Sequence, residues 1–348
     1  MANEVGGRLA HAGYAGLARP VLFRMDAERA HDVSLMLARA ASGSALTRRL
    51  TAAVMSQDAD EGAVDLLGLH FPNRLGLAAG MDKNGAAIPT WSALGFGHVE
   101  VGTVTAIRQP GNPKPRLTRL PRNGALVNTM GFNNDGARAL AERLRRDRQR
   151  GLIDIPVGIS IGKSKVTPLQ SAVQDYLDSL QAVRDVADYL AINVSSPNTP
   201  GLRSLQDAGP LGELLTEIVA EALDTPVLLK LAPDLSDPAV DQALQVATDA
   251  GIAGIIACNT TVSRHGLLGS EGRNAPTSGG LSGAPLRIRA RTIVNRIART
   301  TDFPVIGVGG LMSRDDGIAM MDAGASLVQV YTGLIYGGPK LVRQLRSL

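Results

Sequence analysis

The chain has 348 residues, of which 44% are hydrophobic and 20% charged, and its net charge at pH 7 is +4. This balance is ordinary for a globular protein and argues against a disordered chain or a polytopic membrane protein, and the length allows one large domain or two smaller ones. Aromatic residues make up only 3% of the chain, which argues against a stacking surface for nucleic acid. The single cysteine, Cys258, excludes an intrachain disulfide and a cysteine-ligated iron–sulfur cluster within the chain, so we expect a reducing compartment.

The first 60 residues are predicted to form a separate helical module. Apolar residues recur there at helical spacing in three places, which predicts two or three short helices. Residues 1–56 carry seven arginines against four acidic residues, whereas the first residues lack the apolar core of a secretory signal. Two interpretations stay open: a helical cap packed on the rest of the chain, or a basic amphipathic module lying on an anionic membrane surface.

Residues 61–348 are predicted to form one domain in which strands and helices alternate. Eight alternating pairs are typical of a (β/α)8 barrel, and a doubly wound open sheet is the alternative, weakened by the lack of a G-x-G-x-x-G motif after the first strand. The strands are expected at 75–79, 98–102, 157–161, 189–193, 226–230, 254–258, 304–308 and 326–330. The helices are expected at about 84–94, 133–150, 170–186, 210–222, 238–250, 286–300, 314–323 and 338–347.

Polar or glycine-rich clusters follow nearly every predicted strand, where a barrel of this kind carries its chemistry. Glycine-rich backbone after the last two strands, together with the run 279–283, indicates a phosphate site, although glycines also simply make tight turns. Lys83 and Lys230 at strand ends suggest an anionic ligand or, alternatively, an ordinary salt bridge. Asparagine amides suit a uracil-like ligand, and they recur at Asn128, Asn133, Asn193, Asn198 and Asn259. No cluster with metal-ligand spacing is present, so we predict no metal.

Ten motifs, in order along essentially the whole chain, carry a family resemblance. The segment INVSSPNTPGLR is highly specific, and the chain resembles the class 2 dihydroorotate dehydrogenases, the quinone-dependent flavoenzymes of pyrimidine synthesis. The resemblance implies a barrel that binds one FMN per chain and an N-terminal module that admits ubiquinone or menaquinone from the membrane. The other motifs are NRLGLAAGMDKNG, GFGHVEVGTVT, QPGNPKPRLTRL, NTMGFNNDG, LLKLAPD, NTT, SGGLSG, GVGG and GASLVQVYTG.

The resemblance also implies residue roles. Ser196 would be the base that takes the C5 proton of dihydroorotate, Lys83 would hold the carboxylate, and Lys230 would stabilise negative charge on reduced FMN. The pyrimidine would be bound by Asn128, Thr129, Met130, Gly131, Phe132, Asn193, Asn198, Asn259 and Thr260. FMN would be held by Ala79, Gly80, Met81, Asp82, Lys83, Thr103, Ser160, Asn193, Lys230, Cys258, Gly283, Gly310, Tyr331 and Thr332. The quinone tunnel would be lined by His31, Arg119 and Tyr331.

Two positions depart from the family pattern: Ser160 stands where many relatives have Asn, and Cys258 where Thr is common. The base distinguishes subclasses, because class 1 relatives use Cys and a soluble acceptor or a partner subunit, whereas this loop has Ser196. We therefore expect a peripheral protein on the cytoplasmic side of the cell membrane, with no iron–sulfur partner subunit and no nucleic acid. The rival hypotheses are an FMN barrel with a soluble electron acceptor and a basic nucleic-acid binder.

Overall fold

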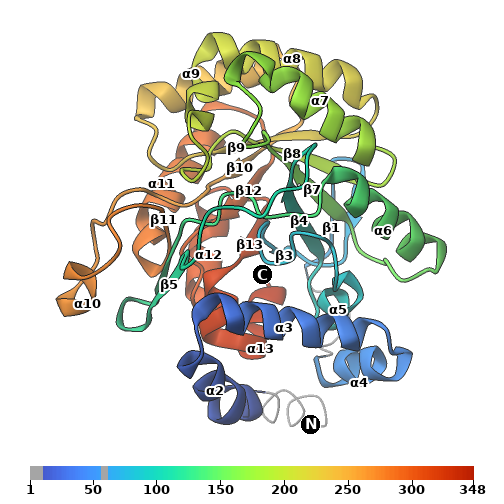
Figure 1. The fold of residues 1–348 in the computed structure, drawn as a ribbon, viewed down its shortest axis with the longest axis vertical. Coiled ribbons are helices and arrows are strands. Elements are labelled where there is room, and N and C mark those ends of the chain that lie inside the picture. Colours follow the sequence, from blue (N-terminus) through green and yellow to red (C-terminus); the bar gives the residue numbers. More distant parts are fainter. Residues whose placement is uncertain (1–10, 56–61) are drawn as a thin grey trace.

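The structure is a computed structural model that describes residues 11–55 and 62–348 (Figure 1). Its N-terminal part is helical, as predicted, and packs beside α5 and α13 at one end of the molecule. The expected domain boundary at residues 60–61 and the charges of Glu4 and Arg8 lie outside the described residues. The N-terminal elements are η1 (Tyr14–Ala18), α2 (Arg19–Arg24), α3 (Ala27–Ser42) and α4 (Ala45–Met55).

Helix α3 begins at a side-chain cap. The Asp26 carboxylate accepts hydrogen bonds from the backbone N–H groups of Glu28 and Arg29, both at 3.0 Å. Such a cap satisfies two of the donors that the first turn of a helix leaves unpaired. The cap therefore fixes where α3 starts, and with it the position of the side chains that α3 directs toward the barrel.

The predicted barrel is present as a closed parallel barrel in which each strand pairs with the next in chain order. All eight predicted strands are confirmed, with end points shifted by up to two residues. The strands are β3 (Leu75–Leu77), β4 (His98–Val104), β7 (Val157–Ile161), β8 (Tyr189–Asn193), β9 (Val227–Leu231), β10 (Gly254–Ala257), β12 (Val305–Val308) and β13 (Leu327–Val330).

A helix follows each barrel strand and covers its outer face (Figure 1). Three of the predicted helices start four or more residues from the expected place. Helices α5 and α6 each begin four residues later, and α13 begins six residues earlier and is kinked at Gly338, whose φ is 58°. The helices are α5 (Ile88–Ala93), α6 (Ala137–Gln149), α7 (Ala172–Val183), α8 (Ala208–Ala222), α9 (Asp237–Asp249), α11 (Arg287–Thr300), α12 (Arg314–Asp322) and α13 (Thr332–Arg346).

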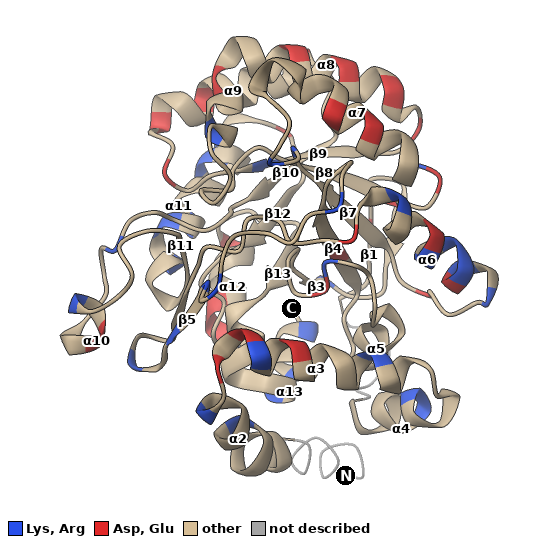
Figure 2. Cartoon of the chain, viewed as in Figure 1, with Lys and Arg blue, Asp and Glu red and all other residues tan. Residues whose placement is uncertain are grey.

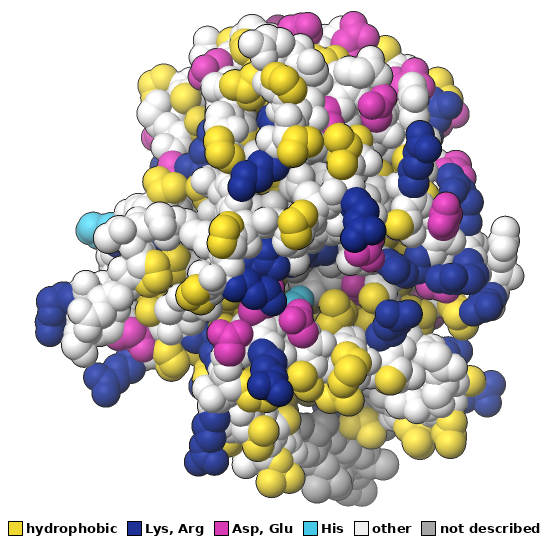
Figure 3. Space-filling model, viewed as in Figure 1, with side chains coloured by type: hydrophobic (Ala, Val, Ile, Leu, Met, Phe, Trp, Pro, Cys, Tyr) yellow, Lys and Arg dark blue, Asp and Glu magenta, His cyan; other side chains and the backbone are white. Residues whose placement is uncertain are grey.

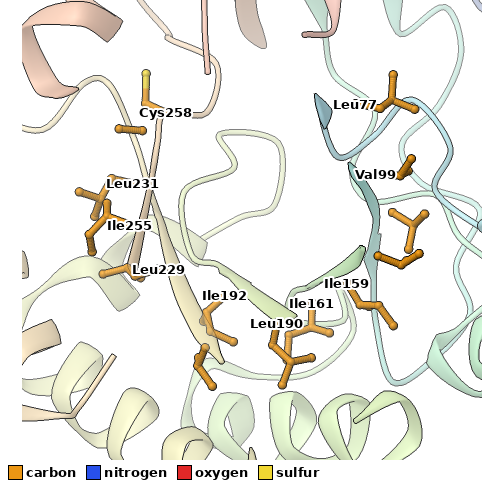
Figure 4. Packing of buried hydrophobic residues seen from close by; sticks show 14 of the residues in the cluster. Leu77, Val99, Ile159, Ile161, Leu190, Ile192, Leu229, Leu231, Ile255 and Cys258 are labelled. Carbon is orange, nitrogen blue, oxygen red and sulfur yellow. The ribbon is translucent and has the colours of Figure 1, made fainter. Parts of the chain in front are cut away.

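Strand side chains alternate between two buried layers. Figure 4 shows Leu77, Val99, Ile159, Leu190 and Leu229 directed away from the barrel axis toward the helices, where they form the larger core cluster. The alternate positions fill the barrel interior with a smaller apolar cluster. Buried polar side chains on the same strands include Glu100, Lys230 and Gln329. The polar positions at the strand ends are thus held by a rigid scaffold.

Two sheets were not predicted. A hairpin of β1 (Val64–Leu66) and β2 (Leu69–Phe71) contributes Phe71 to the cluster inside the barrel. A three-stranded antiparallel sheet is formed by β5 (Leu117–Leu120), β6 (Ala125–Asn128) and β11 (Gly280–Gly283). Asn128 therefore ends a strand of this sheet rather than a barrel strand. A short helix, α10 (Gly269–Arg273), was also missed.

Charge is unevenly spread over the surface. Figure 2 shows acidic residues on α7 and α8 and basic residues on α6 and on the N-terminal helices. Within residues 11–55 and 62–348, no helix combines the length and the apolar character that crossing a membrane requires.

Candidate active site

A cavity of about 1030 Å³, including its open mouth, lies at the carboxyl ends of the barrel strands. We call it the main cavity; its size suits a cofactor together with a small substrate. Its walls come from the barrel strand ends and from β6 and β11. It brings together the predicted residues Ala79, Gly80, Lys83, Thr103, Asn128, Met130, Gly131, Phe132, Asn193, Ser196, Asn198, Lys230, Cys258, Asn259, Thr260, Gly283, Gly310, Tyr331 and Thr332.

One part of the main cavity is lined by glycine backbone. Gly283, Gly309 and Gly310 have φ values of 96°, 126° and 75°, and a Cβ atom on Gly310 would clash with the Arg287 backbone. Thr332 also lines this part and begins α13, so the unpaired N–H groups of the first helical turn lie there. Free backbone donors at a helix N-terminus favour an anion, which fits the phosphate of a mononucleotide cofactor.

The predicted asparagines form two hydrogen-bonded pairs. The Asn198 amide donates to Asn128 Oδ1 at 2.9 Å, and the Asn259 amide donates to Asn193 Oδ1 at 3.1 Å. Each pair fixes the orientation of its amides, which still have polar atoms available for a ligand. Asn133, the fifth predicted asparagine, does not line the main cavity.

Ser196 lies on the loop that follows β8, is 6% exposed and lines the main cavity. Its hydroxyl accepts a 3.3 Å hydrogen bond from the Asn198 backbone N–H. Among the described residues, no carboxylate or imidazole is hydrogen-bonded to this hydroxyl. The hydroxyl of Thr199, further along the same loop, is buried and has no partner in the described part of the chain. Of the polar side chains on this loop, those of Ser196 and Asn198 line the main cavity, and the Thr199 hydroxyl follows them in sequence without lining it.

Lys83 follows β3 and lines the main cavity. Burial and, to a smaller extent, the nearby Arg116 guanidinium lower the pKa of its ammonium to about 8, against the opposite effect of Glu28, Asp32 and Asp82. A buried cation that loses this much solvation is stabilised by an anionic ligand. The position fits a carboxylate-binding role.

Lys230 lines the same cavity but also forms an ion pair. Its ammonium lies 2.8 Å from Glu100 Oε1, and both side chains are buried. Gln329 donates to the other Glu100 oxygen at 2.9 Å, so the carboxylate is held on both sides. The salt bridge that the sequence left as an alternative is thus present, together with contact to the cavity.

Four of the residues predicted to bind FMN or the pyrimidine lie outside the main cavity. The Asp82 carboxylate accepts from the backbone N–H groups of Ala86 and Ala87, which precede α5, and from the indole of Trp91 within α5. Ser160 is hydrogen-bonded to Thr103, which itself lines the cavity. Met81 lines a different cavity, and the Thr129 backbone oxygen accepts from Asn112. These four stay predictions as ligand-binding residues, and the bonds of Asp82 point to a structural role.

A second cavity of about 1070 Å³, including its mouth, lies between the N-terminal helices and the barrel. His31, Arg119 and Tyr331, the residues predicted for a quinone tunnel, all line it. Its other walls are mostly apolar and include Phe23 and Leu334. Tyr331 lines both cavities and is therefore the structural link between them.

The polar groups of the second cavity are held in defined states. Burial lowers the pKa of His31 to about 4, with a contribution from Lys83, so its imidazole is neutral near pH 7. Burial raises the pKa of Tyr331 to about 12, which keeps its phenol protonated. The Arg119 guanidinium donates to the backbone oxygens of Leu22 and Met25 and lies 4.9 Å from the Phe23 ring. The cavity thus offers polar groups at an otherwise apolar site.

Several lining residues were not predicted. Gln329 lines the main cavity, and its side-chain oxygen has no partner in the described part of the chain. Ser282 and Leu286 lie in or next to the motif SGGLSG but were not singled out. Period-2 alternation along β13 could have identified Gln329 as inward-facing, because Leu327 fills the barrel interior two residues earlier.

Comparisons with known proteins agree with this geometry. The family model for dihydroorotate dehydrogenase matches residues 62–347. A curated relative from Chloroflexus aurantiacus, named dihydroorotate dehydrogenase (quinone), is 52% identical over 341 residues, covering 94% of this chain and 93% of the relative. A relative of the same name from Salinispora arenicola is 52% identical over 330 residues, covering 93% and 95%. The solved structure of ligand-free DHODH from Eimeria tenella has a TM-score of 0.83 at 34% identity, covering 92% of this chain and 93% of that one.

Proposed function

This chain belongs to the dihydroorotate dehydrogenase family, and from its two linked cavities we propose how it works as the quinone-dependent type. It oxidises dihydroorotate to orotate in pyrimidine biosynthesis and passes the electrons to a quinone. The observation that carries the mechanism is that the main cavity, the more polar of the two, shares Tyr331 with the largely apolar second cavity. A polar substrate and an apolar acceptor can then react at separate sites.

We assign FMN to the main cavity. The glycine-lined part, with the start of α13, suits the phosphate, and Lys230 and the unpaired side-chain oxygen of Gln329 offer polar contacts where the barrel interior meets the cavity. When bound there, FMN supplies the hydride acceptor and the electron carrier between the two cavities. Ser160 and Cys258 replace groups that are common in the family; Ser160 is already bonded to Thr103, and burial raises the pKa of the Cys258 thiol to about 12, so the thiol stays neutral.

Dihydroorotate binding is assigned to Lys83 and the two asparagine pairs. Lys83 holds the carboxylate, whose negative charge compensates for the lost solvation of the ammonium. The amides of Asn128, Asn193, Asn198 and Asn259 bond the ring, and their mutual hydrogen bonds keep them in place before substrate arrives. Preorganised donors and acceptors lower the cost of orienting the ring.

Ser196 is assigned as the base that takes the C5 proton. A serine hydroxyl is a weak base by itself, so it needs a neighbouring group to accept its own proton. We assign the relay to Thr199 on the same loop, whose hydroxyl is buried and has no partner among the described residues: it would take the Ser196 proton and pass its own proton on to solvent. The Asn198 N–H holds the Ser196 oxygen in position during this transfer.

The second cavity is assigned to ubiquinone or menaquinone. Its apolar walls suit the ring and tail, and the Arg119 guanidinium, with the neutral His31 imidazole, provides polar contacts for a quinone oxygen. Because the electrons leave through this cavity, the mechanism needs no iron–sulfur partner subunit, and nothing in it requires nucleic acid.

We further propose that the protein sits on the cytoplasmic face of the cell membrane. Figure 3 shows hydrophobic side chains on the outer surface of the N-terminal helices, with Lys and Arg side chains beside them. The most exposed apolar residues there are Leu17, Val21, Met36, Leu37, Leu46 and Leu50. An apolar face with adjacent basic residues binds the surface of an anionic bilayer.

An anaerobic titration tests the assigned function. The purified protein should be yellow, dihydroorotate should bleach the flavin absorbance, and a soluble ubiquinone or menaquinone analogue should restore it. Recovery with fumarate or NAD⁺ but not with a quinone would instead identify a soluble acceptor. Flavin that dihydroorotate does not bleach would remove the assignment of the main cavity to this substrate.

A further inference from the structure

The wall of the main cavity at Asn128–Phe132 is supported from behind by residues 109–116, which we call the bracing loop. No residue of this loop lines the main cavity. The Gln109 amide donates to the backbone oxygens of Gly131 and Phe132, both at 3.1 Å. The Asn112 amide donates to the Thr129 oxygen at 3.0 Å and to the Asn198 oxygen at 3.1 Å. The bracing loop thus joins the wall to the Ser196 loop.

The Arg116 side chain determines the shape of the bracing loop. Its Nη1 donates to the backbone oxygens of Pro110 and Asn112, at 2.7 and 2.8 Å. Gly111, between those two residues, has a φ of 80°, and a Cβ atom there would clash with the Arg116 guanidinium. The loop is therefore closed tightly around this guanidinium.

The other edge of the Arg116 guanidinium is bound by Glu28 from the N-terminal helix α3. Nε and Nη2 of Arg116 lie 2.8–3.2 Å from the Glu28 carboxylate oxygens, in a bidentate arrangement. The two side chains are only 6% and 7% exposed. Lys114 also contacts Glu28, at 3.1 Å, but its side chain is 63% exposed. Arg116 is therefore the principal partner of Glu28.

A buried guanidinium depends on its carboxylate for both charge and orientation. Without the charge of Glu28, a buried Arg116 would be a charged group with no anionic partner, which is an unfavourable state. We expect the guanidinium to move toward solvent, which would release Pro110 and Asn112 and then the amide of Asn112 from Thr129 and Asn198. These are the contacts that position the substrate wall.

We propose that Glu28, on an N-terminal helix, is a positioning residue for the dihydroorotate site, acting through Arg116 and the bracing loop. The inference rests on the proposed function, because it takes the wall and the Ser196 loop to bind dihydroorotate. It extends that function by giving the N-terminal helices a role in the oxidation of the substrate as well as in the reduction of the quinone.

The geometry separates this role from the quinone site. On α3, Ala27, Ala30, His31 and Ser34 line the second cavity, whereas Glu28 does not. The Glu28 charge also acts on His31, but it raises the pKa of an imidazole that is already neutral near pH 7, so removing the charge leaves His31 neutral. A change in the Glu28 charge should therefore affect the reaction with dihydroorotate and leave the reaction with quinone nearly unchanged. A merely structural role would affect both reactions together.

The test is Glu28→Gln in the full-length, FMN-loaded protein, with the two half-reactions measured separately by stopped flow. Bleaching by dihydroorotate should show kcat/KM lowered about 10- to 100-fold, the range expected when reacting groups are misplaced. For the other half-reaction, the flavin is first bleached with dithionite and then reoxidised by a quinone analogue. The rate of this reoxidation should change less than about twofold, because the two cavities are separate. The affinity for orotate, measured from the shift that orotate causes in the flavin spectrum, should fall together with kcat/KM for dihydroorotate.

Two controls accompany this variant. Arg29 is the next residue along α3, and its side chain is exposed. Arg29→Gln removes this charge and should change neither half-reaction. Lys114→Gln removes the exposed partner of Glu28 and should produce a much smaller effect than Glu28→Gln. If Glu28→Gln does not fold, Glu28→Asp retains the charge with a shorter side chain and should show the same selective loss to a smaller degree.

Failure of the proposed function and failure of the role of Glu28 would give different results. If dihydroorotate does not bleach the unaltered protein, the proposed function fails first. If it does, and the folded Glu28 variant reacts with dihydroorotate at the normal rate, only the present inference fails. Equal losses in both half-reactions, accompanied by a lower melting temperature, would also overturn it, because Glu28 would then be purely structural.

Discussion

The N-terminal helices and the barrel bury their side chains in very different ways. Every residue of β4, β7 and β8 is buried, whereas α3 buries three of its 16 residues and α4 buries only Met55. The helices are held by individual contacts to the barrel, such as the 2.8 Å hydrogen bond between Ser42 and Thr90. Their stability therefore depends on the barrel surface rather than on a core of their own.

The comparison also separates two kinds of apolar surface. The apolar side chains of the barrel face each other or the surrounding helices. On the N-terminal helices a few, such as Met55 and Leu35, join the barrel core, and most of the others face outward or line the second cavity. A rigid interior suits the positioning of a polar substrate, and an outward apolar face suits contact with lipid and quinone. Substitutions in the two regions should therefore act on different half-reactions, with Glu28 as the exception.

The largest effect is expected for Ser196→Ala, in the barrel. A positioned base contributes about 10²- to 10⁴-fold to a rate, so bleaching of the flavin by dihydroorotate should slow by that factor. FMN content and orotate affinity should remain, and recovery by quinone should be unchanged. Rapid-mixing absorbance measurements would show this, and a near-normal bleaching rate would remove Ser196 from the role of base.

Lys83→Met should have the next largest effect, also in the barrel. Loss of the cation from a buried carboxylate site costs about 2 kcal/mol or more, so KM for dihydroorotate should rise about 30-fold or more. Because the pKa of Lys83 in the free protein is about 8, the ammonium form is lost above that pH. In the unaltered protein kcat/KM should therefore be level below pH 8 and fall above it.

The variant itself checks the assignment of that pH dependence. Lys83→Met has no ammonium to lose, so its lower kcat/KM should show no decline that begins near pH 8. If kcat/KM of Lys83→Met still declines above the same pH as in the unaltered protein, another group is responsible for the titration. The electrostatic argument for Lys83 would then be wrong.

The barrel could be predicted from the sequence because its strands are short apolar runs bounded by turn residues, each followed by a helical pattern. The β1–β2 hairpin was missed because Leu67 and Gly68 both adopt positive φ, at 57° and 72°, and leucine there gives no turn signal. The sheet of β5, β6 and β11 was missed because β11 pairs with β6 across about 150 residues of chain.

The candidate site was predicted unevenly for a related reason. Residues at the ends of barrel strands could be identified from position alone, and most of them line the main cavity. The partners of those residues could not be identified, because Glu100 meets Lys230, and Glu28 meets Arg116, only through the closed fold. Asp82 was grouped with its polar neighbours, although its carboxylate is used to bind the backbone before α5 and the Trp91 indole.

At the second cavity, Arg119→Ala on β5 and His31→Ala on α3 should each act on quinone reduction. Loss of one hydrogen bond from a charged donor costs about 1.5–3 kcal/mol, so Arg119→Ala should raise KM for a quinone analogue about tenfold or more. The neutral His31 should contribute less, about a fewfold change. Bleaching by dihydroorotate should be unchanged in both variants, and equal loss of both half-reactions would contradict the assignment of the second cavity.

The smallest effect is expected at the outer face of the N-terminal helices. Leu46 and Leu50 are 67% and 58% exposed on α4, and replacing either with Glu removes apolar contact and adds repulsion from anionic lipid. A partly inserted leucine contributes about 1 kcal/mol, so each substitution should weaken binding to phosphatidylglycerol-containing vesicles about fivefold, with both half-reactions in detergent unchanged. The matched control is Ile288→Glu, because Ile288 is 73% exposed on α11 of the barrel. If all three substitutions weaken vesicle binding equally, the membrane contact is a property of overall charge and not of the N-terminal helices.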